Sequence, residues 1–262
     1  MAYLERRSRH QLEAIDCSAI KGAIKSAIKN DDAYTISGTK TLVLNGAAAD
    51  VIIVSAKLGE QLGLFAVPTD SEGLSIEPMK LMDGQPIANV ILRGVVVSED
   101  QLLCAPENSM ALLQSIISDV TIAVSAQAVG AMEYLLKASV EYCNTRKQFG
   151  QPIGKFQALQ HRMVDMYTAI EQCRSLLVRA LCSSSGNEPQ AELDIAALKA
   201  MVGKHGRAVA EEAVQLHGGM GVTEELDIGD YLKRLMVIDH LFGDADWHRA
   251  RFAELRQVAI AA

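Results

Sequence analysis

The hydrophobic positions of the chain follow two different patterns, and the change between them falls near residue 107. Before it, short runs rich in β-branched residues are separated by turns such as Asn45–Gly46 and Asp83–Gly84. The runs cover residues 34–40, 41–46, 51–56, 63–68 and 95–98. Short runs with turn residues about every 8 to 12 positions are typical of an antiparallel sandwich or barrel rather than of βαβ units. We therefore predict a β domain over residues 1–107.

From residue 108 onward, the apolar residues recur at helical spacing. The helical stretches cover residues 112–142, 157–182 and 190–216, with weaker candidates at 225–242 and 247–261 and a loop at 183–189. The third stretch stops before Gly218 and Gly219, which is the pattern of a helix C-cap. Several helices with one apolar face each and short connections predict an antiparallel bundle over residues 108–262. The fold class is thus α+β, with a β-sandwich or barrel followed by a helical domain.

The composition is that of a globular protein and excludes several functional classes. The 262 residues are 49% hydrophobic and carry a formal net charge of −7, so no basic excess is available to attract nucleic acid or an anionic membrane. The longest strongly apolar stretch, Val120 to Met132, has 13 residues, whereas a membrane-spanning helix needs about 20. We predict no nucleic-acid partner and no membrane partner.

Two further features predict a cytoplasmic protein. The first ten residues are charged where a signal peptide has its apolar core, so export is not expected. The five cysteines are widely spaced and form no Cys-x-x-Cys pair, so neither a disulfide framework nor a zinc site is predicted.

The segment from Arg146 to Gln157 holds the most informative chemistry. It combines a guanidinium, flat aromatic rings, two glycines and side-chain amides within twelve residues between two helices. Such a group of residues can hold a phosphate and stack on a planar ring. The alternative is a helix–helix loop in which the glycines turn the chain and Phe149 lies in the core.

Two later segments also allow two interpretations. In the segment 215–221, paired glycines allow close approach of a ligand, or simply end a helix. In the segment 242–248, Asp244, Asp246 and His248 could be metal ligands. Their spacing is not specific for a metal site, however, and a helix N-cap is the simpler explanation for the aspartates. We predict no metal.

The sequence contains no Gly-x-Gly-x-x-Gly and no Gly-x-Ser-x-Gly motif, so neither a Rossmann nucleotide site nor a serine nucleophile is expected.

Taken together and in order, four motifs resemble the acyl-CoA dehydrogenase family. They are Gly38 to Asp50, Arg146-Lys-Gln-Phe-Gly, Phe156-Gln157 and Gln215-Leu-His-Gly-Gly-Met-Gly. Within the family, residues 5–9, 156–162 and 241–248 look most similar to the small-subunit type of pimeloyl-CoA dehydrogenase. The resemblance implies a β middle domain and a C-terminal four-helix bundle. A helical domain normally precedes them in the family, and we expect that domain to be missing here.

The resemblance also implies a reaction and its partners. Members of the family bind FAD and oxidise an acyl-CoA thioester to its trans-2-enoyl form, with a carboxylate as the base and an electron-acceptor flavoprotein downstream. They form oligomers, so this chain is expected in a homo-oligomer or with a larger paralogous subunit. The positions that match the family's flavin contacts are Arg146, Gln148, Phe149, Phe156, Gln157, Gln215, Gly218, Gly219, Asp244 and Asp246. The first three would lie near the pyrophosphate and the next two near the adenosine. Gln215 and the two glycines would contact the FAD of a neighbouring subunit.

Several positions depart from the family pattern and leave two hypotheses open. Phe242 occupies the position of the family's usual glutamate base. The family's alternative position for the base falls at Val120, beside Asp119. Asp119 and Asp244 are the remaining carboxylate candidates. Leu42 and Leu44 replace a flavin-facing Trp and Thr, and a Thr-Glu-Pro motif reads Leu4-Glu5-Arg6. The chain is thus expected to be an enzyme subunit of an FAD-dependent acyl-CoA dehydrogenase, or alternatively a non-catalytic or truncated subunit that serves assembly and completes the FAD site.

Overall fold

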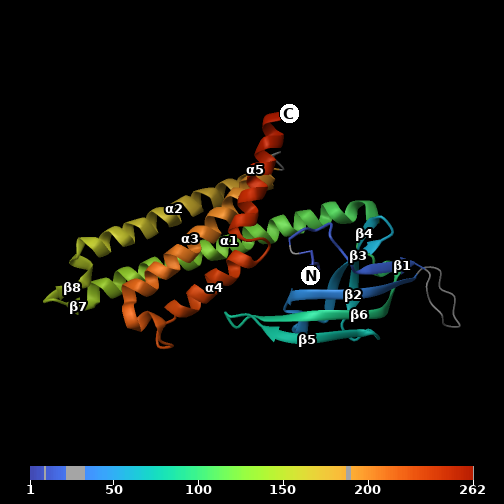
Figure 1. Cartoon of the computed structure of the whole chain (residues 1–262), viewed down its shortest axis with the longest axis horizontal. Helices are drawn as coiled ribbons and strands as arrows, with labels where there is room; N and C mark the ends of the chain where they lie inside the picture. The colour runs from blue at the N-terminus through green and yellow to red at the C-terminus, as the bar shows by residue number, and fades with distance from the viewer. Residues whose placement is uncertain (9, 22–32, 187–189, 262) are drawn as a thin grey trace. The chain divides into compact units, whose positions relative to one another are not determined.

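The computed structural model describes residues 1–8, 10–21, 33–186 and 190–261, with the side chains of 259–261 excepted. The chain divides into two compact units, Met1–Ile116 and Ile117–Ala262. The division falls within helix α1 (Pro106–Thr145), which starts in the first unit and continues through the second (Figure 1). The α+β class is confirmed, with strands in the first unit and helices in the second.

The described strands of the first unit form one six-stranded sheet. They are β1 (Ser18–Lys21), β2 (Ala33–Leu44), β3 (Val51–Leu58), β4 (Gln61–Pro68), β5 (Leu74–Lys80) and β6 (Pro86–Ser98). Their order in the sheet is β4-β3-β1-β2-β6-β5, and every pair is antiparallel except β1 with β3. Tyr34, Ile36, Val54 and Phe65 are among the buried residues that form the core of this unit.

The prediction of separate runs at 34–40 and 41–46 was wrong, because β2 continues through both. The pairing of β2 with β6 shifts register between Lys40 and Val43, which is a β-bulge. Within the bulge, Leu42 has φ +54° and a side chain that is 51% exposed. The bulge therefore turns an apolar side chain outward at a position that the resemblance predicts to be flavin-facing.

The edge strand β5 was not predicted. Its residues are mostly exposed and include Pro78 and two charged residues, Glu77 and Lys80, so the period-two apolar signal is absent. Proline and charge are common on edge strands because they discourage pairing with another chain.

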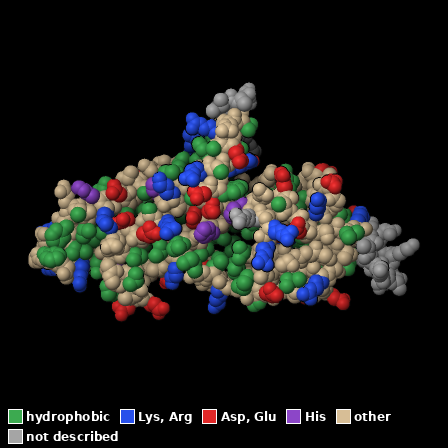
Figure 2. All heavy atoms as spheres, in the orientation of Figure 1, with side chains coloured by type: hydrophobic (Ala, Val, Ile, Leu, Met, Phe, Trp, Pro, Cys, Tyr) green, Lys and Arg blue, Asp and Glu red, His purple; other side chains and the backbone are tan. Residues whose placement is uncertain are grey.

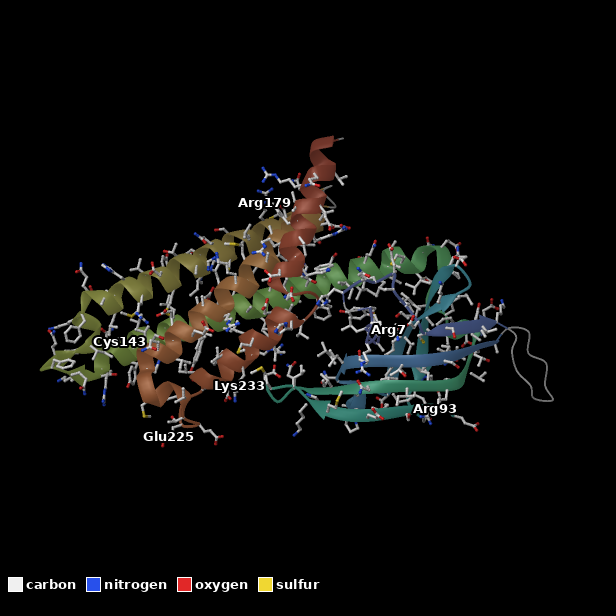
Figure 3. The ribbon with its side chains drawn as sticks, in the orientation of Figure 1. Arg7, Arg93, Cys143, Arg179, Glu225 and Lys233 are labelled. Carbon is white, nitrogen blue, oxygen red and sulfur yellow. The ribbon has the colours of Figure 1, made fainter. Side chains whose placement is uncertain are left out.

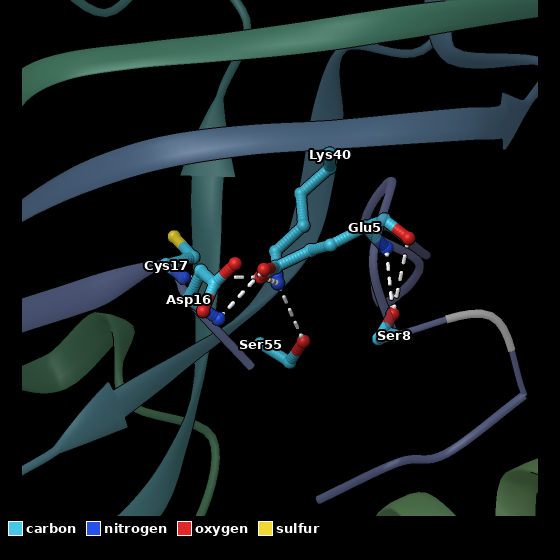
Figure 4. A network of polar contacts seen from close by, with 6 residues as sticks. All are labelled: Glu5, Ser8, Asp16, Cys17, Lys40 and Ser55. Atoms are coloured by element: carbon cyan, nitrogen blue, oxygen red, sulfur yellow. Dashed lines mark hydrogen bonds and ion pairs between the residues drawn. The ribbon is translucent and has the colours of Figure 1, made fainter. Parts of the chain in front are cut away.

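The N-terminal segment is fixed to this sheet by a buried ion pair (Figure 4). The Nζ atom of Lys40 on β2 donates to Glu5 Oε1 at 2.5 Å and to Ser55 Oγ at 3.1 Å. The same carboxylate accepts hydrogen bonds from the backbone N–H groups of Asp16 and Cys17. Because each buried charge has several partners, the cost of removing it from water is offset.

The second unit is a helical bundle. Besides α1, its helices are α2 (Gln157–Ser185), α3 (Ala191–His217), α4 (Ile228–His240) and α5 (Ala245–Ala261). The buried core residues come from α1 to α4, and α5 packs on α3. The predicted helices are confirmed, except that residues 183–185 continue α2 instead of forming a loop, with Ser183 Oγ bonded to the Ala180 carbonyl. Residues 187–189 of that predicted loop lie outside the described residues.

By length and composition alone, α1 could cross a membrane, since an 18-residue window within it has a mean hydropathy of 1.4. This is weak evidence, because the core helix of a bundle passes the same test and Met132 and Leu135 of α1 are core residues. On the face seen in Figure 2, positive and negative side chains are interspersed.

Candidate functional site

A short hairpin connects α1 to α2. It pairs β7 (Lys147–Gln148) with β8 (Gln151–Pro152) around the two residues Phe149 and Gly150. Both turn residues have positive φ, +53° and +82°, which is the conformation of a type I′ turn. Two-residue turns of this kind match the twist of the strands, so the chain forms a compact hairpin that projects from the end of α1.

The Phe149 side chain projects from this turn and is 90% exposed. The alternative that placed Phe149 in the core is therefore wrong. Its nearest aromatic neighbour is Phe156, with ring centroids 6.0 Å apart and planes at 86°. A bulky residue with left-handed backbone is strained, and strain of this kind is concentrated at ligand sites. An exposed ring held in that conformation suits stacking on a planar ligand.

The glycine-rich turn after α3 leaves open space. Gly218 has φ +59°, and a Cβ atom added at Gly218 or at Gly219 would meet no atom within 4 Å. Gly221 is different, because its Cβ would lie 2.8 Å from the Val214 carbonyl oxygen. We conclude that Gly221 serves packing, whereas the first two glycines leave room for a ligand to approach the backbone.

The hairpin and the glycine turn lie at the same end of the bundle, which we call the hairpin end (residues 146–157 and 215–222). The ring of Tyr142 on α1 lies 4.5 Å from that of His217 on α3, measured between centroids. Nearby, Arg162 Nη1 lies 2.8 Å from Glu212 Oε2. Figure 3 shows the labelled Cys143 at this end.

The side chains at the hairpin end are available to a ligand. The residues that are exposed there and match the family's flavin contacts are Arg146, Gln148, Phe149, Gln157 and Gln215. Phe156 is half-buried. Among the described residues, the Arg146 guanidinium has no ion pair and no hydrogen bond. An exposed guanidinium without a carboxylate partner can bind a phosphate in a bidentate manner.

Asp244 and Asp246 lie away from the hairpin end, at the connection between α4 and α5. Helix α4 has 13 residues and is therefore about 20 Å long, so the two groups of predicted flavin contacts lie at opposite ends of this helix. Asp244 Oδ1 accepts a hydrogen bond from Trp247 N at 2.8 Å, which confirms the N-cap prediction. Asp246 Oδ1 lies 3.0 Å from Arg249 Nη2.

The α4–α5 turn (residues 241–244) has an unusual backbone. Phe242 has φ +58° and Gly243 has φ +103°. His248 Nε2 lies 2.9 Å from the Phe242 carbonyl oxygen, which accepts the hydrogen bond. A pocket of about 720 Å³ lies beside the turn, between α3 and α5, and its charged lining is of both signs: Lys204, Arg207, Asp239, Asp244, Asp246 and Arg249.

The two ends differ in their fit to a flavin nucleotide. The hairpin end offers a cation, an exposed ring and open backbone, all of which suit a pyrophosphate and an adenine. At the start of α5, Asp244 already occupies a helix N-terminal donor and Asp246 adds a second carboxylate, which is 83% exposed. A phosphate would meet like charge there instead of the favourable end of the helix dipole. The chemistry of the hairpin end therefore suits a pyrophosphate better than that of the start of α5 does.

Asp119 is exposed on α1, and the 26 helical steps from it to Thr145 correspond to about 39 Å of helix. Leu42 and Leu44 belong to the first unit. None of these positions adds a base to the hairpin end.

Sequence reasoning missed the most perturbed cation in the second unit, Lys199. Its side chain is fully buried, and burial lowers its pKa from 10.5 to about 8. The only sequence signal was a lysine directly after the buried position Leu198 and before Val202, within the apolar face of α3.

Comparison with known protein families gives two matches. The family description "Acyl-CoA dehydrogenase, middle domain" matches residues 16–95, and "Acyl-CoA dehydrogenase, C-terminal domain" matches residues 110–255. The first match covers most of the sheet, and the second runs from α1 into α5.

Curated relatives are longer than this chain. The probable acyl-CoA dehydrogenase YngJ of Bacillus subtilis is 32% identical over 221 residues, which are 81% of this chain and 58% of YngJ. The short-chain specific acyl-CoA dehydrogenase of Megasphaera elsdenii is 30% identical over 217 residues, which are 79% of this chain and 56% of the relative. The chain thus spans a little more than half of the length of these relatives.

Solved structures share the fold. PigA with FAD and proline superimposes with a TM-score of 0.90 at 23% identity, covering 100% of this chain and 67% of PigA. Butyryl-CoA dehydrogenase from Megasphaera elsdenii gives 0.87 at 26% identity, covering 97% and 66%. A chain of the ChsE4–ChsE5 complex from Mycobacterium tuberculosis gives 0.81 at 24% identity, covering 93% and 62%.

Proposed function

The chain belongs to the acyl-CoA dehydrogenase family, and from that premise we propose that it is a subunit of a heteromeric FAD-dependent acyl-CoA dehydrogenase. In this proposal the hairpin end completes an FAD site on a paralogous partner subunit. The partner supplies the carboxylate base and the flavin contacts that neither the hairpin end nor the α4–α5 turn provides. FAD, when bound, accepts the hydride from the β-carbon of the acyl-CoA.

One contrast carries the proposal. The hairpin end has an exposed Arg146 without a described partner, the projecting ring of Phe149 and two open glycines. The position of the usual base is Phe242, whose ring cannot accept a proton. A chain that keeps nucleotide-binding chemistry and lacks the base fits a division of labour between two subunits. A chain of the ChsE4–ChsE5 complex shares this fold, which supports the choice of a heteromeric assembly.

The finer assignments follow from the same proposal. We place the chain with the small-subunit type of pimeloyl-CoA dehydrogenase, on the resemblance of residues 5–9, 156–162 and 241–248. The reaction is α,β-oxidation of an acyl-CoA thioester to its trans-2-enoyl form. An electron-acceptor flavoprotein would then reoxidise the flavin.

A second candidate is a non-catalytic subunit that serves assembly only. It is favoured by an apolar row on α2, where Val164, Tyr167, Val178 and Leu181 are each at least 45% exposed. Such a row needs a protein partner, because large uncovered apolar surface promotes association. This candidate predicts a complex in which the hairpin end contributes nothing to flavin binding.

A titration separates the two candidates. The chain is purified in complex with a full-length paralogous subunit that retains the glutamate base, and FAD is titrated by flavin fluorescence. Arg146→Ala should weaken FAD binding by about tenfold or more, because a charge-assisted hydrogen bond is worth about 1.5–3 kcal/mol. Lys147→Ala, in the same hairpin, is the matched control and should change little. Equal FAD affinity for Arg146→Ala and the unmodified complex would favour the assembly-only subunit.

A further inference from the structure

The buried Lys199 joins two parts of the bundle through backbone oxygens. Its Nζ atom donates to the carbonyl oxygen of Asp239 at 2.7 Å and to that of Gly243 at 2.6 Å. Asp239 lies in the last turn of α4, and Gly243 lies in the turn that leads to α5. The C-terminal carbonyls of a helix have no intrahelical partner and carry the negative end of its dipole. A single ammonium thus satisfies the end of α4 and fixes the following turn.

The surroundings of Lys199 are built for this contact. Asp239 Oδ1 accepts a hydrogen bond from Ala245 N at 3.1 Å, so the same residue also anchors the first residue of α5. A Cβ atom added at Gly203 would lie 2.1 Å from Asp239 Oδ1. Only glycine on this face of α3 leaves space for that carboxylate, one turn after Lys199.

The turn itself needs to be held. Phe242 adopts a left-handed φ of +58°, which is strained for a residue with a large side chain. Such a conformation persists only where neighbouring contacts determine it, and here two successive carbonyl groups of the turn are fixed. The Phe242 carbonyl accepts from His248 and the Gly243 carbonyl accepts from Lys199. A Cβ at Gly243 would lie 2.7 Å from His248 Nε2, so the turn and α5 are also in close contact.

We propose that Lys199 is a positioning residue, which acts through the carbonyl groups of Asp239 and Gly243 to hold the α4–α5 turn in the conformation that presents residues 242 and 244. The role of the turn in a flavin site rests on the proposed function, in which residue 242 is the family's base position and residue 244 is a flavin contact. The geometry of the turn is a property of this chain alone. It can therefore be measured without flavin and without a partner.

The single tryptophan of the chain gives a local probe. Trp247 lies three residues after Asp244, and its ring packs edge-on against His248 with centroids 4.6 Å apart. Its fluorescence reports on the turn, whereas circular dichroism reports on the whole bundle. Lys199→Met removes the ammonium at similar volume, and Lys137→Met at an exposed position of α1 is the matched control.

The test compares these variants far below their unfolding temperatures. For Lys199→Met we expect unchanged helical circular dichroism, a shifted Trp247 emission and amide exchange of residues 241–245 that is about tenfold faster, because one or two hydrogen bonds to the turn are lost. Lys137→Met should match the unmodified chain. Unchanged emission and exchange in Lys199→Met would overturn the proposal. Lys199→Gln is the second variant, and loss of helical structure in both Lys199 variants would also overturn it, since the lysine would then support the whole bundle.

The flavin complex supplies a separate readout. With the paralogous subunit bound, Lys199→Met should weaken FAD binding by several fold while Lys137→Met does not. If Lys199→Met loosens the turn in the isolated chain but leaves FAD affinity unchanged, Lys199 still positions the turn. That result would contradict a role of the turn in the flavin site. Absence of flavin from every complex would count against the proposed function and would leave the measurements on the isolated chain valid.

Discussion

Lys40 and Glu5 form an ion pair at 2.5 Å, with side-chain exposures of only 0% and 5%. The pair fixes the N-terminal segment to β2 next to the bulge that exposes Leu42, and Thr41 N also donates to the Leu4 carbonyl at 2.9 Å. A buried ion pair is not by itself a large source of stability, but removal of one partner leaves the other charge uncompensated.

Lys40→Met should therefore destabilise the first unit by about 3–5 kcal/mol. The double variant Lys40→Met with Glu5→Gln should recover part of that loss, since no buried charge is then left unpaired. Urea unfolding followed by the loss of sheet circular dichroism measures both. If Lys40→Met alone were as stable as the unmodified chain, the ion pair would not anchor this segment.

Replacement of Phe149 should raise the stability of the chain and weaken flavin binding by the complex. Phe149→Asn gives Asn-Gly, the sequence most typical of a type I′ turn, so the left-handed conformation becomes less costly and the unfolding free energy should rise by about 0.5–1 kcal/mol. Flavin affinity of the complex should fall, because the projecting ring is lost. Gly150→Ala is the opposite control, since φ +82° strains any side chain there, and it should lower stability. A lower unfolding temperature for Phe149→Asn would contradict the strain argument.

The buried Lys199 should make the stability of the helical unit depend on pH. Its pKa is lowered to about 8 in the folded chain, against 10.5 for an exposed lysine, mainly because burial disfavours the charged form. The unfolded chain then binds more protons between these values, so the lysine's contribution to stability rises from pH 8 to 10.5 and is lost as the pH falls through 8. The shift corresponds to about 3 kcal/mol.

This contribution is best measured as a difference. Asp239, Asp244 and His248 face the same region, and the first two favour the charged lysine. The unfolding free energies of the unmodified chain and of Lys199→Met should therefore diverge above pH 8, with the unmodified chain gaining. Parallel curves up to pH 10 would show that Lys199 does not titrate in this range.

The cysteines should differ sharply in reactivity. Burial raises the pKa of Cys17 to about 11 and that of Cys173 to about 12, and Cys143 is buried too. Cys182 is exposed and Cys104 is half-buried. Since the thiolate is the reactive form, a thiol reagent at pH 8 should label Cys182 first, and Cys182→Ser should remove the fast phase. Rapid labelling of Cys17 or Cys173 in the folded chain would contradict their burial.

The helices were predictable because each carries a continuous apolar face, and every predicted helical stretch has a counterpart in the bundle. The strand β5 was not, since an exposed edge strand has no buried face to give a pattern. The motifs predicted that the segment from Arg146 to Gln157 lies between two helices. The left-handed turn that exposes Phe149 was not predictable, because it depends on hairpin geometry that residue types alone do not specify. Lys199 could not be assigned from sequence, because its carbonyl partners are 40 and 44 residues away and meet it only when α4 and α5 pack on α3.

In the proposed function, this chain supplies one end of a flavin site that a partner completes. The most direct measurement is the visible absorbance spectrum of the purified chain, recorded alone and in complex with its paralogous subunit after incubation with FAD and removal of the unbound nucleotide. We expect a flavin band in the complex, strongly reduced by Arg146→Ala, and no band for the chain alone. A complex without flavin, or one whose band is the same with Arg146→Ala, would contradict it.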